Sequence, residues 1–183
     1  MKRIGGLYEK IISPENLRVA DVIARKGKRR QYGVRQFDKA PEAKLQALHQ
    51  MLRARTYKTS PYTTFKVYEP KEREVFRLPY FPDRILHHAI MNILEPILTA
   101  QFTADTYSCI KGKGIHGAFR KLRSALQDEK GTRYCLKLDI TKFYPSIDHS
   151  ILKNLLRRKF KDENLLWLLE EIIDSAPGIP IGN

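Results

Sequence analysis

The amino-acid sequence predicts an α+β fold, and three observations lead to this prediction. Apolar residues recur at helical spacing along much of the chain, as in Leu45, Leu48 and Leu52. Residues 63–68 are rich in Thr, Phe, Val and Tyr, and after a turn at 69–72 residues 73–78 form a return segment with Val75 and Phe76 apolar, which is typical of a β-hairpin. The apolar run from Tyr134 ends at Asp139 and predicts a buried strand.

The bulk properties are those of a protein with a real core. The chain has 183 residues, enough for one domain or one and a half, and 42% of them are hydrophobic. No run approaches the roughly 20 apolar residues that span a bilayer, and no apolar signal core follows Met1, so we expect a cytoplasmic protein without a membrane partner. Cys109 and Cys135 lack metal-ligand spacing, and we expect buried, reduced thiols.

The positive charge is concentrated in the first third of the chain. The net charge is +14, and residues 1–60 hold 15 Lys and Arg against 5 Asp and Glu, whereas residues 61–183 hold 19 against 15. A basic surface of this size favours a polyanionic partner such as RNA or DNA. The alternative is a surface that only keeps the protein soluble.

Three helices are expected in this basic third, over residues 4–12, 17–30 and 41–52. The second helix runs into a cluster of five cations that are candidate nucleic-acid contacts: Arg25, Lys26, Lys28, Arg29 and Arg30. Tyr32 and Arg35 continue this basic patch and can stack on and pair with a single strand. The alternative is an exposed helix end that favours cations through its dipole.

The hairpin is also basic, since it carries Lys66, Lys71, Arg73 and Arg77. Phosphate recognition is one explanation, because an Arg side chain pairs bidentately with phosphate oxygens; protection of an edge hairpin by charge is the other. A helix is expected over residues 83–100. His87 and His88 lie on it without acidic or Cys partners at ligand spacing, which favours polar helix residues over metal ligands.

A glycine-containing loop precedes a further helix at residues 116–126. Gly112 and Gly114 allow the backbone to approach a ligand, and Lys111 and Lys113 add charge, although a flexible turn explains the same residues. The spacing is not that of a Walker loop. Two more helices are expected, one from Ile151 and one over residues 163–173.

Asp139 is the candidate with the most chemistry around it. A carboxylate at the end of a buried strand is costly unless it is paired or binds a cation, so a salt-bridged or capping Asp is one explanation. Phe143 and Tyr144 follow closely, and Lys137 and Lys142 flank the acid. These neighbours favour a metal-bound, polyanionic substrate. Asp148 instead has the context of a helix N-cap.

The segment from Leu138 to His149 resembles the first catalytic motif of bacterial reverse transcriptases. The likeness is closest to diversity-generating retroelements, with group II introns and retrons nearby. The segment from Gly178 to Asn183 resembles a later motif of the same family, in the right order, and the likeness extends from about Tyr62 to the last residue. It implies a reverse transcriptase fingers and partial palm: a basic helical N-terminal extension at 1–60, fingers with the hairpin at 61–131, and the first part of the palm at 132–183.

The resemblance also implies roles for single residues. Asp139 would be the catalytic carboxylate on a palm strand and, with the carbonyl of Ile140, a ligand of Mg²⁺. Tyr144 would lie beneath the nucleotide sugar and select deoxynucleotides. Candidates for the incoming triphosphate are Arg73, Arg77 and Arg84, and Lys111 and Lys113 would touch nucleic acid. The implied partners are an RNA template, a DNA or RNA primer and deoxynucleoside triphosphates, with self-association left open.

One departure from the family bears on activity. The family's second carboxylate motif consists of an aromatic residue, then any residue, then Asp-Asp. This motif does not occur in this sequence. One Asp holds two Mg²⁺ ions poorly, so we expect a fragment of a longer enzyme, inactive alone. A non-catalytic, maturase-like RNA-binding module is the alternative. A metal-dependent nuclease is weaker, because no second acidic cluster occurs.

Overall fold

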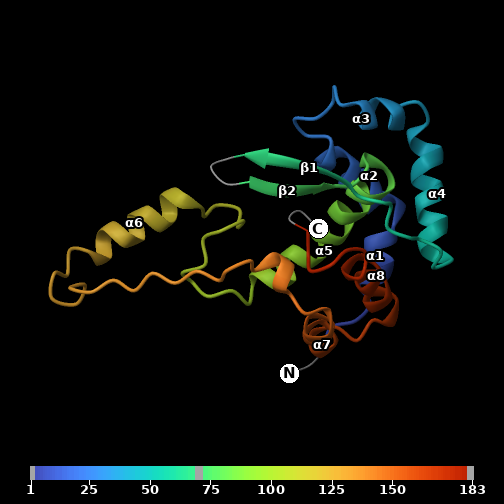
Figure 1. Ribbon diagram of the computed structural model, residues 1–183. Coiled ribbons are helices and arrows are strands. Elements are labelled where there is room, and N and C mark those ends of the chain that lie inside the picture. Colours follow the sequence, from blue (N-terminus) through green and yellow to red (C-terminus); the bar gives the residue numbers. More distant parts are fainter. Residues whose placement is uncertain (1–2, 69–71, 181–183) are drawn as a thin grey trace. The chain divides into compact units, whose positions relative to one another are not determined.

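The computed structural model describes residues 3–68 and 72–180 (Figure 1). It divides into two compact units: the first comprises residues 1–93 and 142–183, and the second comprises residues 94–141. The described residues form helices with one small antiparallel sheet, as expected for an α+β chain. The division into an extension, fingers and palm stays a prediction. None of the described helices is long and apolar enough to cross a bilayer.

Four helices make up the N-terminal part of the first unit: α1 (Tyr8–Ile12), α2 (Pro14–Ala24), α3 (Tyr32–Phe37) and α4 (Pro41–Arg53). The α2 helix starts with Pro14 in its first turn and with Ser13 Oγ accepting the Asn16 N–H at 3.2 Å. The α2 and α4 helices pack on each other and on α1. The side chains buried there are apolar: Ile11, Ile12, Leu17, Leu48 and Leu52.

The prediction of a helix over residues 17–30 is wrong at its C-terminal end. The α2 helix ends at Ala24, and residues 25–30 form successive turns. Gly27 has a φ of +73°, a left-handed conformation that glycine adopts readily and that a helix cannot continue through. The basic cluster therefore lies in turns after the helix. The α3 helix was not expected from the sequence.

The structure confirms the predicted hairpin. Strands β1 (Thr63–Tyr68) and β2 (Glu72–Arg77) pair antiparallel, with Thr63 opposite Arg77 and Val67 opposite Arg73. The expected turn at residues 69–72 falls largely outside the described residues. After β2 the chain forms a kinked turn, η1 (Tyr80–Arg84), in which Phe81 is not helical, and then α5 (Ile85–Thr99).

Two helices complete the first unit, α7 (His149–Lys159) and α8 (Glu163–Ile173), after the short turn η2 (Tyr144–Ser146). Asp148 caps α7 by accepting the Ile151 N–H at 3.0 Å, which confirms the predicted cap. The α7 and α8 helices pack on each other. Ile4 pairs with Phe160 in an isolated parallel bridge, so the beginning of the chain is bound to the loop between α7 and α8.

The second unit contains the end of α5, a loop, and α6 (Ile115–Ala125). Its last residues correct a prediction: Tyr134 to Ile140 form no strand, and the side chains of Tyr134, Leu136 and Leu138 are 81–87% exposed. A strand needs a partner, and none of the other described segments pairs with this one. For the same reason Cys135 is exposed rather than buried, and Cys109 is exposed in the loop.

Candidate nucleotide and nucleic-acid site

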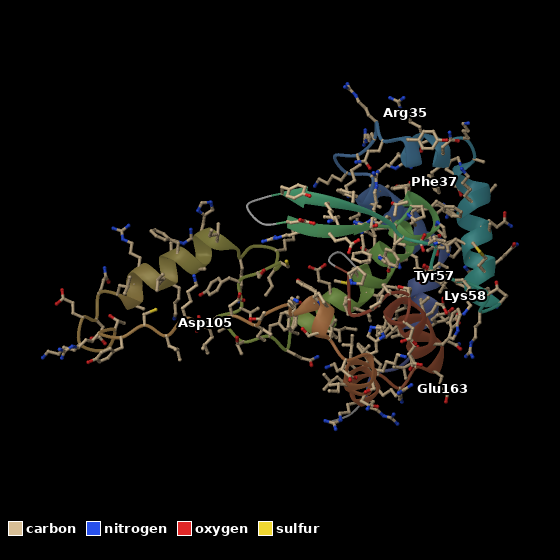
Figure 2. All side chains as sticks on the ribbon, viewed as in Figure 1. Arg35, Phe37, Tyr57, Lys58, Asp105 and Glu163 are labelled. Carbon is tan, nitrogen blue, oxygen red and sulfur yellow. The ribbon has the colours of Figure 1, made fainter. Side chains whose placement is uncertain are left out.

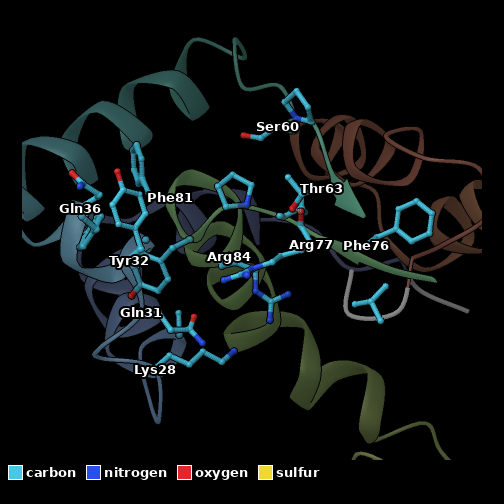
Figure 3. A pocket seen from close by; sticks show the side chains of 18 of the residues that line it. Lys28, Gln31, Tyr32, Gln36, Ser60, Thr63, Phe76, Arg77, Phe81 and Arg84 are labelled. Atoms are coloured by element: carbon cyan, nitrogen blue, oxygen red, sulfur yellow. Dashed lines mark hydrogen bonds between the residues drawn. The ribbon is translucent and has the colours of Figure 1, made fainter. Parts of the chain in front are cut away.

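A cavity of about 950 Å³ lies in the first unit, bounded by the turns after α2, by α3, by the hairpin and by η1 (Figure 3). Residues separated by as many as 60 positions in the sequence meet here, because α3 packs against η1. Phe37 of α3 makes an edge contact with the Tyr80 ring at 5.5 Å between centroids. The Tyr80 hydroxyl donates to the carbonyl of Asp21 at 3.2 Å and to its carboxylate, which holds η1 against α2.

Three cations predicted from separate motifs line this cavity. Lys28 comes from the basic cluster, Arg77 from the end of β2, and Arg84 from η1. Figure 3 shows the three side chains directed into the same space. Lys44, whose Nζ donates to the Gln36 carbonyl, is a fourth cation of the lining. Several positive groups around one concave surface favour a polyanionic ligand, and the two guanidinium groups suit phosphate oxygens.

The cavity wall also carries aromatic rings. Tyr32 of α3 is 77% exposed and Phe65 of β1 is 48% exposed, while Phe76 and Phe81 are half-buried. Exposed rings beside cations provide stacking surfaces for nucleobases and charge for the backbone, the combination that single-stranded nucleic acids require. Figure 2 shows that Phe37 turns into the unit from α3 while Arg35 extends outward, so Arg35 lies away from the cavity.

A buried carboxylate supports one side of the cavity. Asp83 is fully buried, and its Oδ1 accepts the Tyr57 hydroxyl at 2.7 Å and the Ser60 N–H at 3.0 Å. Burial, followed by the neighbouring Asp83 carboxylate, raises the pKa of Tyr57. These two bonds hold the chain before β1 against η1, so the cavity residues Ser60 and Arg84 are fixed relative to each other.

The five predicted cations of the basic cluster differ in burial and in their contacts. Arg25 is mostly buried and forms ion pairs with Asp21 at 2.7 Å and with Asp38 at 2.9 Å, so it links α2 to the end of α3. Its Nε and Nη2 donors are thus engaged within the protein, and its role as a phosphate contact stays a prediction. Lys26, Arg29 and Arg30 are exposed in the turns and lie outside the cavity.

Two predicted nucleotide-binding residues lie elsewhere in the first unit. Arg73 is exposed on β2 but does not line the cavity, so the structure separates it from Arg77 on the same strand. Tyr144, 44% exposed, also lies outside the lining. Its carbonyl instead accepts the Ile179 N–H at 3.0 Å, so the segments that resemble two motifs of one family contact each other.

The remaining predicted residues belong to the second unit and are described within it. Lys113 donates to the Ala104 carbonyl at 2.7 Å and lies 5.5 Å from the centroid of the Tyr107 ring, whereas Lys111 is exposed. Asp139 and Ile140 are exposed in the extended segment. In residues 3–68 and 72–180 no group of three or more His, Cys, Asp or Glu side chains is arranged to hold a metal ion.

Sequence reasoning missed the residues that shape the cavity. Asp83 lies 26 residues after Tyr57 and 23 after Ser60. The sequence feature that could have indicated this contact is an acidic residue directly before Arg84, at the start of an apolar helix. The sequence predicts His87 as a polar helix residue without indicating its burial. Its ring is largely buried, and burial lowers its pKa to about 4.

No protein-family model matches the chain. Among curated proteins, it is 29% identical over 92 residues to nuclear intron maturase 1, mitochondrial, of Arabidopsis thaliana, which covers 50% of this chain and 12% of the relative. It is 27% identical over 121 residues to protein YkfC of Escherichia coli (strain K12), covering 63% of this chain and 32% of that protein.

A third relative is the group II intron-encoded protein LtrA of Lactococcus lactis subsp. cremoris, 23% identical over 137 residues, which cover 74% of this chain and 22% of LtrA. The chain thus spans 12% to 32% of the length of these relatives. The relatives thus include nuclear intron maturases and a group II intron-encoded protein, at 23% to 29% identity.

Proposed function

We propose that this chain is the fingers and first palm part of a reverse transcriptase of the group II intron type, whose whole protein copies RNA into DNA by nucleotidyl transfer. Its similarity to intron maturases and to an intron-encoded protein supports this class over the diversity-generating retroelements and retrons that the motif also resembles. The observation that carries the proposal is the cavity lined by Lys28, Arg77 and Arg84.

In this proposal the cavity receives the triphosphate of an incoming deoxynucleotide. Arg77 and Arg84 pair with phosphate oxygens, and Lys28 adds a third positive charge. The buried Asp83 supports this arrangement, because its bonds to Tyr57 and Ser60 fix the wall next to Arg84. Tyr144 selects deoxynucleotides over ribonucleotides. To test this, the ratio of deoxynucleotide to ribonucleotide incorporation is measured for the whole protein and for its Tyr144→Ala variant.

The experiment is a titration of the 183-residue chain with a deoxynucleoside triphosphate, followed by NMR or calorimetry. Arg77→Ala is expected to weaken binding about tenfold or more, because a charge-assisted hydrogen bond contributes about 1.5–3 kcal/mol. Arg73→Ala is the matched control: the same residue type on the same strand, outside the cavity. Equal losses in both variants, or no loss in Arg77→Ala, would contradict the assignment of the cavity.

We further propose Asp139 as one carboxylate ligand of Mg²⁺, an ion that stabilises charge on transferring phosphates. Asp139 and the Ile140 carbonyl supply too few oxygens for two ions, so the described residues do not complete a metal site. Paramagnetic Mn²⁺ should broaden the NMR signals of residues around Asp139 in the wild-type chain, and this broadening should be absent from the Asp139→Asn variant. Asp128→Asn, another exposed carboxylate of the second unit, is the control.

A non-catalytic RNA-binding role is the second candidate, and the specific observation for it is that two relatives are named intron maturases. It shares the basic surface with the first proposal but does not need the cavity to bind a triphosphate. Tight binding of structured RNA by the chain, with no saturable binding of deoxynucleoside triphosphates, would favour it.

A further inference from the structure

The contact between the segments at 142–149 and 178–180 includes a histidine whose two ring nitrogens both face acceptors. His149 Nδ1 lies 3.1 Å from Asp174 Oδ1, and its Nε2 lies 2.8 Å from the Gly178 carbonyl oxygen. The ring is placed by its position in the first turn of α7, directly after the N-cap Asp148. It reaches from α7 both to the end of α8 and to the segment that follows it.

Neither acceptor has a proton to offer. A backbone carbonyl only accepts, and Asp174 is ionised at neutral pH because hydrogen bonds from Lys153 and from His149 hold its pKa below the usual range. A neutral imidazole carries one N–H and would leave one of the two contacts without a hydrogen. The doubly protonated ring satisfies both contacts.

The segment that this ring holds lies directly on Tyr144 and Pro145. Gly178 has a φ of +60°, and the Ile179 N–H donates to the Tyr144 carbonyl at 3.0 Å. A Cβ added at Gly178 would lie 2.6 Å from that same carbonyl oxygen and 2.7 Å from Pro145 Cα. The backbone at Gly178 and Ile179 therefore acts as a close-fitting support for Tyr144.

We propose that His149 is a positioning residue for Tyr144: with a proton on each ring nitrogen, the ring holds the Gly178–Ile179 backbone against Tyr144. When the ring carries one proton, the Asp174 carboxylate retains it on Nδ1, and the hydrogen bond from Nε2 to the Gly178 carbonyl is lost. The part played by Tyr144 in sugar selection rests on the proposed function, but the contact itself does not. The support is therefore complete only in the doubly protonated ring.

Charged groups face the ring from the elements packed around it. On α7 these are Lys153, which pairs with Asp174, and Asp148, whose carboxylate accepts from Ser150 and from the Ile151 N–H. At the end of α8 it is Asp174. The described residues 178–180 and η2 bring no acidic or basic side chain. One acceptor carboxylate, itself paired with a lysine, thus sets the charge around His149.

The test is an NMR titration of the 183-residue chain from about pH 5 to 9, a range that spans the ordinary titration of histidine. The imidazole signals of His149 report its protonation, and the exchange protection of the Ile179 amide reports the contact with Tyr144. We expect the protection factor to fall at least tenfold with the same midpoint as the imidazole titration. A protection factor of the Ile179 amide that stays constant while His149 loses its proton would overturn the proposal. This measurement uses the wild-type chain alone.

Two variants sharpen the result. In His149→Gln the Ile179 protection should be low and independent of pH, whereas the matched control His116→Gln, at an exposed position on α6, should keep the wild-type profile. Wild-type protection in His149→Gln would also overturn the proposal. No nucleotide is present in this experiment, so its outcome is separate from that of the triphosphate titration.

Discussion

Single buried polar residues determine much of the local geometry around the cavity. Asp83 accepts two hydrogen bonds through Oδ1, yet its Oδ2 and both ring nitrogens of His87 have no hydrogen-bond partner among the described residues. His87 lies four residues after Asp83, in the first turn of α5, which directly follows η1. Burial penalises the charged form of the His87 ring, so its pKa is lowered and the neutral form is favoured.

This burial predicts a pH dependence of stability. The folded pKa of His87, about 4, lies below the roughly 6.5 of an unfolded histidine, so the unfolded chain binds more protons between these values. Stability should be complete above about pH 6.5 and fall by roughly 3 kcal/mol as the pH drops to about 4. Urea unfolding of wild type and of His87→Leu at about pH 7, 5.5 and 4 measures this decline.

The Leu variant should lose most of that acid sensitivity, because it removes the buried imidazole, whose two ring nitrogens are unpaired among the described residues. His88 also contributes in the same direction, since burial lowers its pKa, so some slope should remain. His116→Gln, exposed on α6, is the control and should keep the wild-type decline. An identical pH profile in wild type and His87→Leu would contradict the prediction.

At the scale of elements, two aspartates have the same local role and different tertiary roles. Asp148 caps α7 only, whereas Asp162 caps α8 through the Leu165 N–H at 3.3 Å and also accepts the Leu7 and Tyr8 N–H groups at 2.9 Å. One carboxylate thus satisfies the first turns of two helices that are about 155 residues apart in sequence.

Asp162→Ala should therefore destabilise the protein by roughly 2 kcal/mol or more, because three backbone donors lose their acceptor. Asp148→Ala, which removes a cap with no long-range partner, is the matched control and should cost clearly less. Thermal or urea unfolding of both variants gives the comparison. Equal costs would mean that the contact of Asp162 with α1 contributes little.

At the scale of the whole molecule, the charge distribution predicts how the chain binds RNA. Lys26, Arg29 and Arg30 are exposed in the turns after α2, while Arg25 is engaged in ion pairs. Exposed cations that bind phosphates release counterions, so removing such a cation reduces the dependence of RNA affinity on salt. The three exposed cations, and not Arg25, should carry the contribution of this cluster.

Replacing Lys26, Arg29 and Arg30 with Ala should weaken RNA binding and lower the slope of log affinity against log salt by up to about 2–3, as expected for three phosphate contacts. The control replaces Lys10, Arg53 and Arg55, which removes the same charge from exposed positions of the same third of the chain. Filter-binding titrations at several salt concentrations measure both. Equal slopes for the two triple variants would exclude a localised contact.

The sequence by itself determined the elements whose signals are local. The hairpin follows from alternation in two short segments, α8 from helical spacing, and the cap at Asp148 from its place before an apolar helix. The concentration of charge in residues 1–60 needs no structure either. Such features depend on residues that are close together in the sequence, and sequence patterns contain information about neighbours at this distance.

Only the tertiary structure decided which of the candidate cations lie together. Packing of α3 on η1 brings Lys28, Arg77 and Arg84 to one cavity and leaves Arg73 outside, and Arg25 forms ion pairs with Asp21 and Asp38. The segment at 134–140 shows the same limit, because an apolar run becomes a strand only when another strand pairs with it. Partners distant in sequence decide these outcomes, since burial and hydrogen bonding are properties of the folded surroundings.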